Sequence, residues 1–482
     1  MKIVIFLVIF LTSVFAENKN VTLNEAIQIA LEKNKQNEIS KLALEIAKVQ
    51  YEQALSANYP AINAMVVGQR KKDDVIFQQR GEFTLPSSFS KTLALANALQ
   101  ISDSAIREAT LAGITATPES AFPEGSISAD IDAKAMGRDT VKASLNILYP
   151  LFTGGKISSL IEQAKLNKLL ATNKITRANQ DVIFDIKKYF YGYVLTNELY
   201  NLSNSTLKTM KFVSSLTKQF YENGNSLNVK KTDYLSVQVT ESLIESIVAK
   251  LELNRAMVKS ALANAMGLPW DSEINPIYKD SQLLPPNYIL ADLVKEAYRA
   301  NTDITQMDIA LKISEQQIKE QQAGHYPTVA LMGEVSHTYN SYEYGFLNED
   351  HANSWNVGFA VDMPIFDGFR TTNAVKEKKL DKKKMYLLQD MLKDGLALQI
   401  KNELTKASIG FKQIQTLKNT KKLAKENKEL NIKGYEIDAI ETEKVIQAQY
   451  IETYVKADYL KYVHDYLISL ATIDKLIGTG LK

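Results

Sequence analysis

The feature that most constrains this chain is a short phrase that occurs twice in nearly the same form. Residues 150–155 read PLFTGG, and residues 364–369 read PIFDGF. Each copy follows a run in which apolar and polar residues alternate, and each precedes a long stretch rich in Lys, Glu and Leu. A boundary phrase that recurs in the same context indicates an internal repeat, and it predicts that the fold is built from two similar halves.

Ordered landmarks extend the similarity beyond the phrase. An offset of 267 residues places Leu23, Ala30, Asn34 and Tyr59-Pro60 on Leu290, Ala297, Asn301 and Tyr326-Pro327. The phrase has an offset of 214, and Gly267 and Gly478 have one of 211. We therefore predict a first repeat over residues 17–267, a Pro-rich linker over 268–289 and a second repeat over 290–482. The first repeat carries 53 additional residues, which we assign to an extra segment over about residues 70–135.

Each repeat shows the same sequence of periodicities. It opens with helical spacing, and the absence of Gly and Pro between Thr22 and Tyr59-Pro60 predicts one uninterrupted helix of about 55 Å. Period-2 alternation then predicts strands over 61–69, over 141–147, after Pro327 and before Pro364. Beyond each phrase the period is helical for about 110 residues, which predicts long antiparallel helical hairpins.

The phrase is therefore interpreted as a strand-to-helix junction. Proline closes the strand, and glycine permits the change of direction. The junction candidates are Tyr59, Pro60, Pro150, Phe152 and Gly154 in the first repeat, and Tyr326, Pro327, Pro364, Phe366 and Gly368 in the second.

The N-terminus has the pattern of a secretory signal peptide. Lys2 precedes an apolar run over residues 3–11, and Ser13-Val14-Phe15-Ala16 offers small residues at the −3 and −1 positions for cleavage after Ala16. A membrane-spanning anchor is the alternative, but about ten apolar residues are too few for a bilayer that needs about 20. We predict a signal peptide over residues 1–16, and membrane insertion of the exported chain would have to use strands.

Composition argues against several classes of function. The 57 basic and 55 acidic residues nearly balance, unlike the basic surface of a nucleic-acid binder. The chain has no cysteine, and its four histidines lack the i,i+4 spacing of metal ligands. Without a Gly-rich loop, a nucleophile elbow or a metal cluster, we predict no catalytic site, no metal site, no cofactor and no enzymatic activity.

Four strands with one apolar face suggest a membrane sheet, although single-chain barrels begin at eight strands. Open edges in lipid would leave backbone groups unpaired, whereas three chains would supply twelve strands and no edge. The aromatic residues Tyr149, Phe152, Trp355 and Phe366 at strand ends suit a membrane interface. We predict an α+β membrane protein with a trimeric 12-stranded β-barrel and a long antiparallel coiled-coil tunnel. The alternative is a soluble sheet with helical arms.

The order of these motifs resembles the TolC-like outer-membrane efflux proteins, also called outer membrane factors. The resemblance rests on the signal peptide, the two L-x6-A-x3-N helices ending in Tyr-Pro, the two P-[LI]-F-x-G junctions and the paired long helices. It implies a homotrimer in lipid of the outer membrane of a Gram-negative bacterium, with a large periplasmic part. It also implies a passive exit channel for drugs, small molecules or proteins. The implied partners are a periplasmic adaptor and an inner-membrane RND or ABC transporter.

The same resemblance points to the tips of the hairpins. The family's tip phrase resembles residues 438–449, and residues 232–238 downstream of 222–226. The best-known members carry two aspartates there one helical turn apart, whereas this chain has Lys444 and Gln447. We predict altered ion selectivity at this gate. The alternative is that Lys444 lies on a solvated outer face.

The family's closing contacts join a Thr-Asp pair to a tyrosine and an arginine. Thr232, Asp233 and Tyr435 match this set, but Ile440 stands at the arginine position. The resemblance therefore implies one closing contact without the salt bridge, unless Asp233 pairs with Lys444.

The sequence does not decide the role of the extra segment or exclude one alternative function. The extra segment, in which residues 93–112 predict a short helix, is expected outside the cell as a lid or a receptor surface. A trimeric coiled-coil adhesin or envelope protein without transport activity is the alternative function, although strands in the middle of both halves argue against it.

Overall fold

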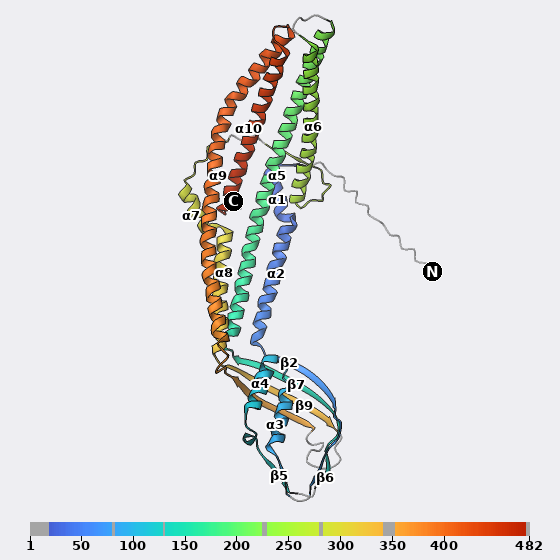
Figure 1. Ribbon diagram of the computed structural model, residues 1–482, viewed down its shortest axis with the longest axis vertical. Coiled ribbons are helices and arrows are strands. Elements are labelled where there is room, and N and C mark those ends of the chain that lie inside the picture. Colours follow the sequence, from blue (N-terminus) through green and yellow to red (C-terminus); the bar gives the residue numbers. More distant parts are fainter. Residues whose placement is uncertain are drawn as a thin grey trace, which may run out of the picture. The chain divides into compact units, whose positions relative to one another are not determined.

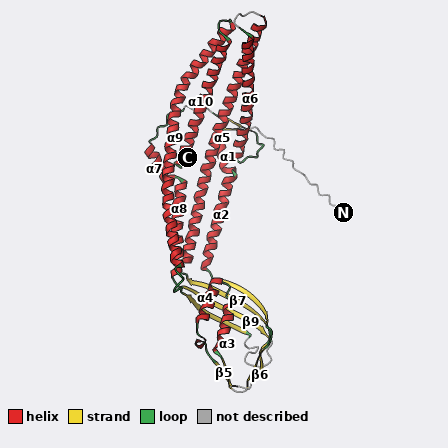
Figure 2. Ribbon diagram, viewed as in Figure 1, coloured by secondary structure: helices red, strands yellow, loops and turns green. Residues whose placement is uncertain are grey.

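The computed structural model describes residues 19–79, 82–128, 131–223, 229–278, 283–340 and 352–478. The predicted signal peptide, residues 1–16, lies outside these residues, as do residues 224–226 of the first predicted tip phrase. Helices account for most of the described chain (Figure 2).

The elements are numbered in chain order, and Figure 1 labels all the helices and some of the strands. The helices are α1 (Leu23–Lys33), α2 (Lys35–Leu55), α3 (Ser87–Ala98), α4 (Ser104–Ala116), α5 (Lys156–Asn223), α6 (Lys231–Ala265), α7 (Leu290–Ala300), α8 (Thr302–Gln322), α9 (Arg370–Glu436) and α10 (Thr442–Leu476). Three single 3₁₀ turns are η1 (Ser56–Asn58), η2 (Glu119–Ala121) and η3 (Ala323–His325). The strands are β1 (Lys19–Val21), β2 (Ala61–Arg70), β3 (Val75–Gln79), β4 (Glu82–Leu85), β5 (Gly125–Ser128), β6 (Ile131–Met136), β7 (Asp139–Phe152), β8 (Ile274–Pro276), β9 (Thr328–Asn340) and β10 (Asn353–Asp362).

The chain divides into two compact units. The helical unit contains Met1–Glu45, Leu169–Ile309 and Leu387–Lys482, and the sheet unit contains Ile46–Lys168 and Ala310–Tyr386. Helices α2, α5, α8 and α9 contribute residues to both units. No helix in the described part of the chain has the length and apolar character needed to cross a membrane.

The sheet unit is organised around one antiparallel sheet in the order β10-β9-β7-β2. These strands arise from the four segments in which period-2 alternation predicts strands. The apolar residues of one face of the sheet remain exposed, including Val66, Leu145, Val335 and Val357, which are 51–71% exposed. On the opposite face Ser144 and Ser336 are buried. A soluble sheet would bury its apolar face, so this sheet has the reverse polarity.

Two details of the sheet unit differ from the sequence expectations. Strand β7 continues through Pro150 to Phe152, with an irregularity in its pairing to β9 at this point, so Pro150 does not close the strand. A bulge lets the proline lie in a strand because its missing N–H falls where the ladder is already interrupted. In the extra segment, the single helix predicted over residues 93–112 is instead the pair α3 and α4, which separate because Asp103 caps α4 through Ala105 N (2.9 Å) and Ile106 N (3.1 Å).

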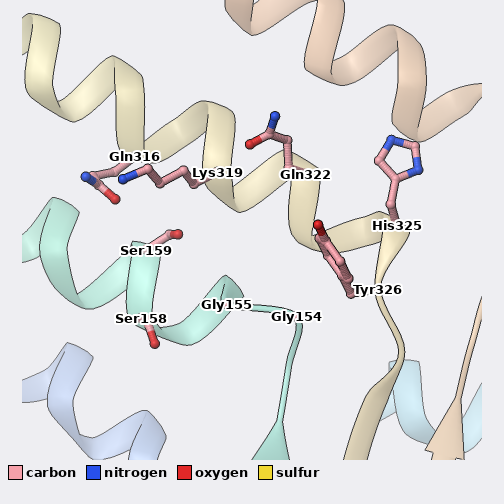
Figure 3. Close-up of a pocket in the computed structure, with 9 residues that line it drawn as sticks. All are labelled: Gly154, Gly155, Ser158, Ser159, Gln316, Lys319, Gln322, His325 and Tyr326. Atoms are coloured by element: carbon pink, nitrogen blue, oxygen red, sulfur yellow. The ribbon is translucent and has the colours of Figure 1, made fainter.

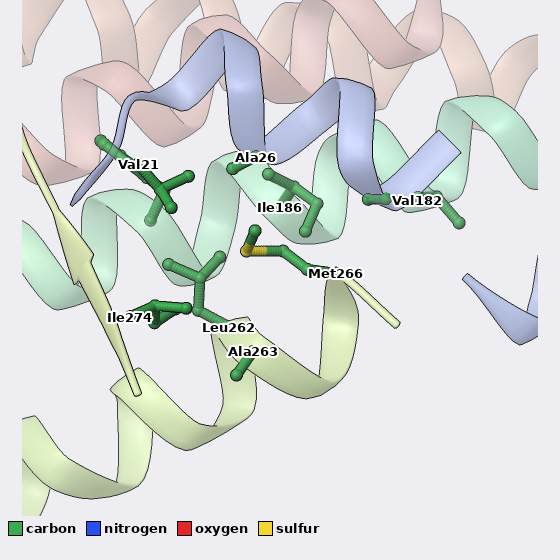
Figure 4. Close-up of a cluster of buried hydrophobic side chains, with 10 residues drawn as sticks. Val21, Ala26, Val182, Ile186, Leu262, Ala263, Met266 and Ile274 are labelled. Atoms are coloured by element: carbon green, nitrogen blue, oxygen red, sulfur yellow. The ribbon is translucent and has the colours of Figure 1, made fainter. Parts of the chain in front are cut away.

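In the helical unit, two buried clusters use positions that correspond under the predicted internal repeat. The first contains Ala26, Ala30, Val182, Ile186, Leu262 and Met266 (Figure 4), and the second contains Leu293, Ala297, Leu396, Ile400, Ile473 and Ile477. The positions in the two clusters are separated by the same 267, 214 and 211 residues as the sequence landmarks. Each short helix, α1 or α7, thus packs its small and aliphatic residues onto its own pair of long helices.

The prediction of one uninterrupted helix before Tyr59 is wrong, because the helix is interrupted at Asn34, between α1 and α2. Asn34 is extended (φ −67°, ψ 126°), its Oδ1 accepts from Gln36 N (2.7 Å), and its Nδ2 donates to Ala265 O (2.7 Å). Asn301 makes the corresponding hydrogen bonds between α7 and α8. Its Oδ1 accepts from Asp303 N (2.8 Å), and its Nδ2 donates to Leu476 O (2.9 Å). Asparagine competes with the helix through such local hydrogen bonds, which explains a break without Gly or Pro.

Candidate functional site

The two copies of the repeated phrase form the same junction in the sheet unit. Before α5, Thr153 Oγ1 accepts a hydrogen bond from Ile157 N (3.3 Å). Before α9, Asp367 Oδ2 accepts from Thr371 N (2.9 Å) and from Thr371 Oγ1 (2.5 Å). Different side chains at the same place in the phrase therefore satisfy a free backbone donor at the start of each long helix.

The residues that follow these caps have left-handed backbones. Gly154 and Gly155 have φ of 63° and 89°, and Gly368 and Phe369 have φ of 66° and 64°. At Gly154 a side chain is excluded on a second ground, because a Cβ would lie 2.7 Å from Ala323 O and 2.8 Å from Tyr326 Cβ. The phrase of the first half thus touches the Tyr-Pro turn of the second half.

A cavity of about 550 Å³ lies beside this contact, between α8 and the start of α5 (Figure 3). It is lined by Gly154, Gly155, Ser158, Ser159, Gln316, Lys319, Gln322, His325 and Tyr326. Within the described ranges no set of three His, Cys, Asp or Glu side chains could hold a metal ion. The lining offers hydrogen-bonding groups and one lysine, but no paired nucleophile and base.

Several junction aromatics are largely exposed in the single chain. Tyr59, Phe152, Tyr326 and Phe366 are 48–76% exposed, and Phe366 packs edge-on against Phe369 at 5.6 Å between ring centroids. The structure brings Gly154 and Tyr326 together, and it pairs Phe152 with Val329 in the sheet register. The role of these residues as a boundary between two environments stays a prediction.

The Asp367 cap is expected to depend on pH. Hydrogen bonds from the Thr371 hydroxyl and backbone N–H hold the pKa of Asp367 below its usual value. A lowered pKa in the folded state means that the carboxylate stabilises the junction above the unfolded pKa, and that this contribution disappears as the pH falls through the folded value. We expect Asp367→Ala to speed amide exchange in the first turn of α9 at pH 7. Asp367→Thr, which copies Thr153, should restore protection and remove the acid sensitivity, and equal exchange in all three proteins would contradict the cap.

The tip of the second hairpin is organised around Tyr435 in the helical unit. The Tyr435 side chain is 1% exposed and packs with Met210, Val213, Val237 and Val445. Its hydroxyl lies 2.7 Å from Thr217 Oγ1 and accepts a hydrogen bond from Thr442 Oγ1 (3.1 Å). Three hydroxyls from α5, α9 and α10 are therefore joined inside an apolar cluster.

The other predicted tip residues are not among the hydrogen-bond partners of Tyr435 Oη, which are Thr217 and Thr442 in the described structure. Thr232 is exposed, and Asp233 Oδ2 accepts from Lys230 N (2.7 Å) at the start of α6. Ile440 packs against Gly434 and the Tyr435 cluster. Lys444 is exposed, and Gln447 Nε2 donates to Glu443 Oε1 (2.8 Å). Over the described ranges no ion pair links Asp233 to Lys444.

Sequence reasoning missed a buried charge close to this tip. Glu452 is 2% exposed on α10, forms an ion pair with Lys456, and lies 4.0 Å from Lys428 Nζ on α9. Its Oε2 also accepts from Gln449 Nε2 (3.3 Å). The i,i+4 spacing of Glu452 and Lys456 was a readable signal for the pair, whereas nothing local in the sequence indicates Lys428.

A second set of charges joins α5, α8 and α10. Arg177 forms ion pairs with Asp181 (3.0 Å) and Asp303, and Lys475 pairs with Asp181 (2.6 Å). Partial burial alone would lower the pKa of Arg177, but the hydrogen bond and charge of Asp303 keep it above its usual value. These ion pairs hold α8 and α10 against α5.

The sequence is similar to a known protein family and to several of its relatives. The sequence profile of the family "Outer membrane efflux protein" matches residues 91–268 and 293–479. Nodulation protein T of Rhizobium leguminosarum bv. viciae is 24% identical over 310 residues, covering 62% of this chain and 61% of that protein. The probable efflux pump outer membrane protein TtgC of Pseudomonas putida is 22% identical over 365 residues, covering 75% and 63%. The matches therefore span less than two thirds of these relatives' own length.

Solved structures show the same fold at lower sequence identity. The CmeC outer membrane channel of Campylobacter jejuni superposes with a TM-score of 0.72 at 14% identity, covering 95% of this chain and 86% of that one. The outer membrane protein VceC of Vibrio cholerae gives 0.69 at 15% identity, covering 95% and 97%. The resemblance predicted from the motifs is confirmed. Because the family profile matches more than half of its length, this chain belongs to the outer membrane efflux protein family and is located in the outer membrane.

Proposed function

We propose that this protein is the outer-membrane exit channel of a tripartite efflux or type I secretion system, assembled as a homotrimer. Three chains close a 12-stranded β-barrel in the membrane, and their long hairpins continue it as a helical tunnel. One observation carries the proposal: the sheet β10-β9-β7-β2 exposes an apolar face and has two edges without a partner strand among the described residues.

The unpaired edges are the physical argument for three chains. Strands β2 and β10 are each 10 residues long, and a free edge in lipid would leave several kcal/mol of hydrogen bonding unmade per backbone group. Because all neighbouring strands are antiparallel and their number is even, β10 of one chain would run antiparallel to β2 of the next. Three copies give the twelve strands of a closed barrel, in which no edge remains.

The polar face of the sheet supports the assignment of a lumen. Asn63, Asn146, Glu334 and Asn356 are direct cross-strand neighbours, so one row of polar groups crosses all four strands. Lys142 pairs with Glu334 on the same face. In a closed barrel this row faces the interior, and the exposed apolar residues face lipid.

The partners and the transport mechanism are also part of the proposal. The family is that of outer membrane efflux proteins, and the relative TtgC is named as a probable outer membrane protein of an efflux pump. The resemblance to TolC-like proteins implies a periplasmic adaptor and an inner-membrane transporter. We assign the chain an adaptor and an RND or ABC transporter on this basis, with passive conduction and no enzymatic role of its own. The two repeats over 17–267 and 290–482, joined by 268–289, supply six similar hairpins to the trimer's tunnel.

Deletion of the encoding sequence tests the function. We expect the deletion strain to become more susceptible to drugs or to lose a secreted protein, and the intact chain to restore the lost property. An unchanged strain whose protein fractionates with soluble periplasmic material would contradict the channel. That result would favour the alternative of an envelope structural protein.

The tip of the tunnel is proposed to have weakened cation preference because Lys444 stands where the family carries an acidic residue. Three lysines in one ring repel cations, and nearby Glu441 and Glu443 offset them only in part. We expect Lys444→Ala to shift the reversal potential in planar bilayers toward greater cation selectivity. Lys401→Ala, which removes an exposed lysine far from the end of α9, serves as the control. Strong cation selectivity that is identical in wild type and Lys444→Ala would contradict the proposal.

A further inference from the structure

The extra segment of the first repeat places a helical hairpin against the polar face of the sheet. Helices α3 and α4 pack together (Figure 1), and α4 also contacts β10. Lys91 of α3 links the two helices, because its Nζ donates to Thr115 O (3.2 Å) and Thr117 O (2.7 Å) at the end of α4. Ser90 Oγ also donates to Pro123 O (3.1 Å). The hairpin is therefore a preformed unit rather than an irregular loop.

The hairpin lies on the face of the sheet that bears the polar row. Residues from α3, α4 and their connection share one cavity with Asn63, Asn146, Glu334 and Asn356, and this row includes a member of each of the four strands. The same cavity is also lined by Ala61, the first residue of β2, and by Leu148 of β7. The space between the hairpin and the polar face thus extends as far as the strand end that follows α2 and η1.

We propose that the hairpin of α3 and α4 is a plug that closes the lumen of the barrel and moves aside during transport. The inference rests on the proposed function, because the polar face is a lumen only if three chains close the barrel. It gives the extra segment a role inside the channel rather than as a surface outside the cell.

The dimensions of a twelve-stranded barrel leave little room beside three such hairpins. Strands about 4.8 Å apart and tilted by about 40° give a barrel roughly 24 Å across between backbones. A helix with its side chains is about 10 Å across, so six helices have about the same total cross-section as the lumen. Round cross-sections leave gaps between them, so six helices do not fit side by side in this circle, and only the hairpins of one or two chains can take the observed position at the same time. A hairpin in that position already covers about a third of the area between the backbones, and it therefore obstructs the path of a transported molecule.

The contact between the hairpin and the sheet has features that allow the hairpin to leave the sheet and return. A cavity of about 560 Å³ remains between them, and polar side chains of both the hairpin and the sheet line part of it. The Gln100 Oε1 atom is buried near the turn without a hydrogen-bond partner within the described structure. A contact that leaves such a cavity and an unpaired buried oxygen is not a fully packed core. The hairpin can therefore leave the sheet at a small net cost, because water can then pair with the polar groups that become exposed.

The test measures access to the lumen from outside the cell. The chain has no cysteine, so a single cysteine in place of Asn146 reports on the polar row. We expect a membrane-impermeant thiol reagent to label Asn146→Cys slowly in the intact chain. Labelling should be at least tenfold faster when residues 87–116 are replaced by a short Gly-Ser linker. Asp73→Cys in an exposed loop should react fast in both backgrounds, and Leu145→Cys on the apolar face in neither.

The outcomes separate the plug from the channel. Fast labelling of Asn146→Cys in both backgrounds overturns the plug but leaves the channel intact. Slow labelling in both backgrounds, with Asp73→Cys still fast, shows that no lumen opens to the outside and overturns the proposed function.

A second measurement decides the matter if the shortened chain fails to fold. In intact cells, a flexible bifunctional thiol reagent should join Ile101→Cys at the hairpin turn to Leu148→Cys on β7, because both side chains line the same cavity. The matched pair Ile101→Cys and Leu145→Cys should not be joined, because Leu145 lies on the opposite face. Absence of the first link would place the hairpin outside the lumen and overturn the plug.

Discussion

Replacing Gly267 by alanine is expected to cause one of the largest losses of stability that a single substitution can produce in this chain. Gly267 lies just after the end of α6 and has a φ of 74°. A Cβ at this position would overlap the backbone carbonyl group of Lys33. The left-handed conformation costs a non-glycine residue about 1–2 kcal/mol, and the overlap involves backbone that cannot rotate away. We expect a loss of more than about 3 kcal/mol in unfolding free energy, measured by thermal or urea unfolding followed by circular dichroism.

The controls for this prediction separate strain from overlap. Gly478 has φ of 75°, and a Cβ there would lie 2.6 Å from Ala300 O, so Gly478→Ala should behave like Gly267→Ala. Gly155 has φ of 89° but no atom within 4 Å of the Cβ position, so Gly155→Ala should cost only about 1–2 kcal/mol. Equal losses at Gly267 and Gly155 would show that close approach of the short helices to the long ones is not the constraint.

Replacing Lys456 by methionine is expected to have the second large effect. The substitution removes the closer of two lysines from Glu452, whose side chain is 2% exposed, and leaves Lys428 Nζ at 4.0 Å. A buried carboxylate deprived of its partner destabilises a protein by about 3–5 kcal/mol, because the charge has lost both water and its counter-ion. Urea unfolding of the purified protein measures the loss directly.

A matched exposed pair provides the control. Lys425 and Glu429 have the same i,i+4 type of ion pair, at 3.7 Å, but their side chains are more than half exposed. Lys425→Met should therefore change stability by less than about 1 kcal/mol. The double variant Lys456→Met with Glu452→Leu should recover most of the stability, since no charge is left buried. If Lys456→Met and Lys425→Met proved equivalent, Glu452 would have to be solvated in the folded protein.

The parts of the fold that sequence predicts well are those encoded by local period. The alternation at β7 and β10 and the helical spacing of α5, α6, α9 and α10 are visible without any long-range information. The glycines of the junction phrase were predictable because glycine has a strong local preference, and Gly154 and Gly368 do have left-handed backbones. The prediction for Pro150 was wrong, because β7 continues through it.

The features that sequence did not predict depend on partners far away in the chain. The break at Asn34 is fixed by Ala265 O, and the burial of Tyr435 by Thr217, each more than 200 residues distant. Glu452 gives no sign of being buried, because an isolated Glu-Lys pair on a helix is usually exposed. The position of α3 and α4 on the polar row depends on the register of four strands, which only the folded sheet establishes.

The closure of the barrel by three chains can be tested at the two free edges of the sheet. The measurement is oxidative cross-linking of a cysteine at Met65 on β2 with one at Asn356, Gly358 or Ala360 on β10, all on the polar face. In outer membranes, at least one pair should convert the chain to a covalent trimer on a denaturing gel. Met65→Cys with Ser336→Cys, two strands apart in the same sheet, should not link. A scan in which every β2–β10 pair leaves only monomers, or links stop at dimers, would contradict the trimeric barrel.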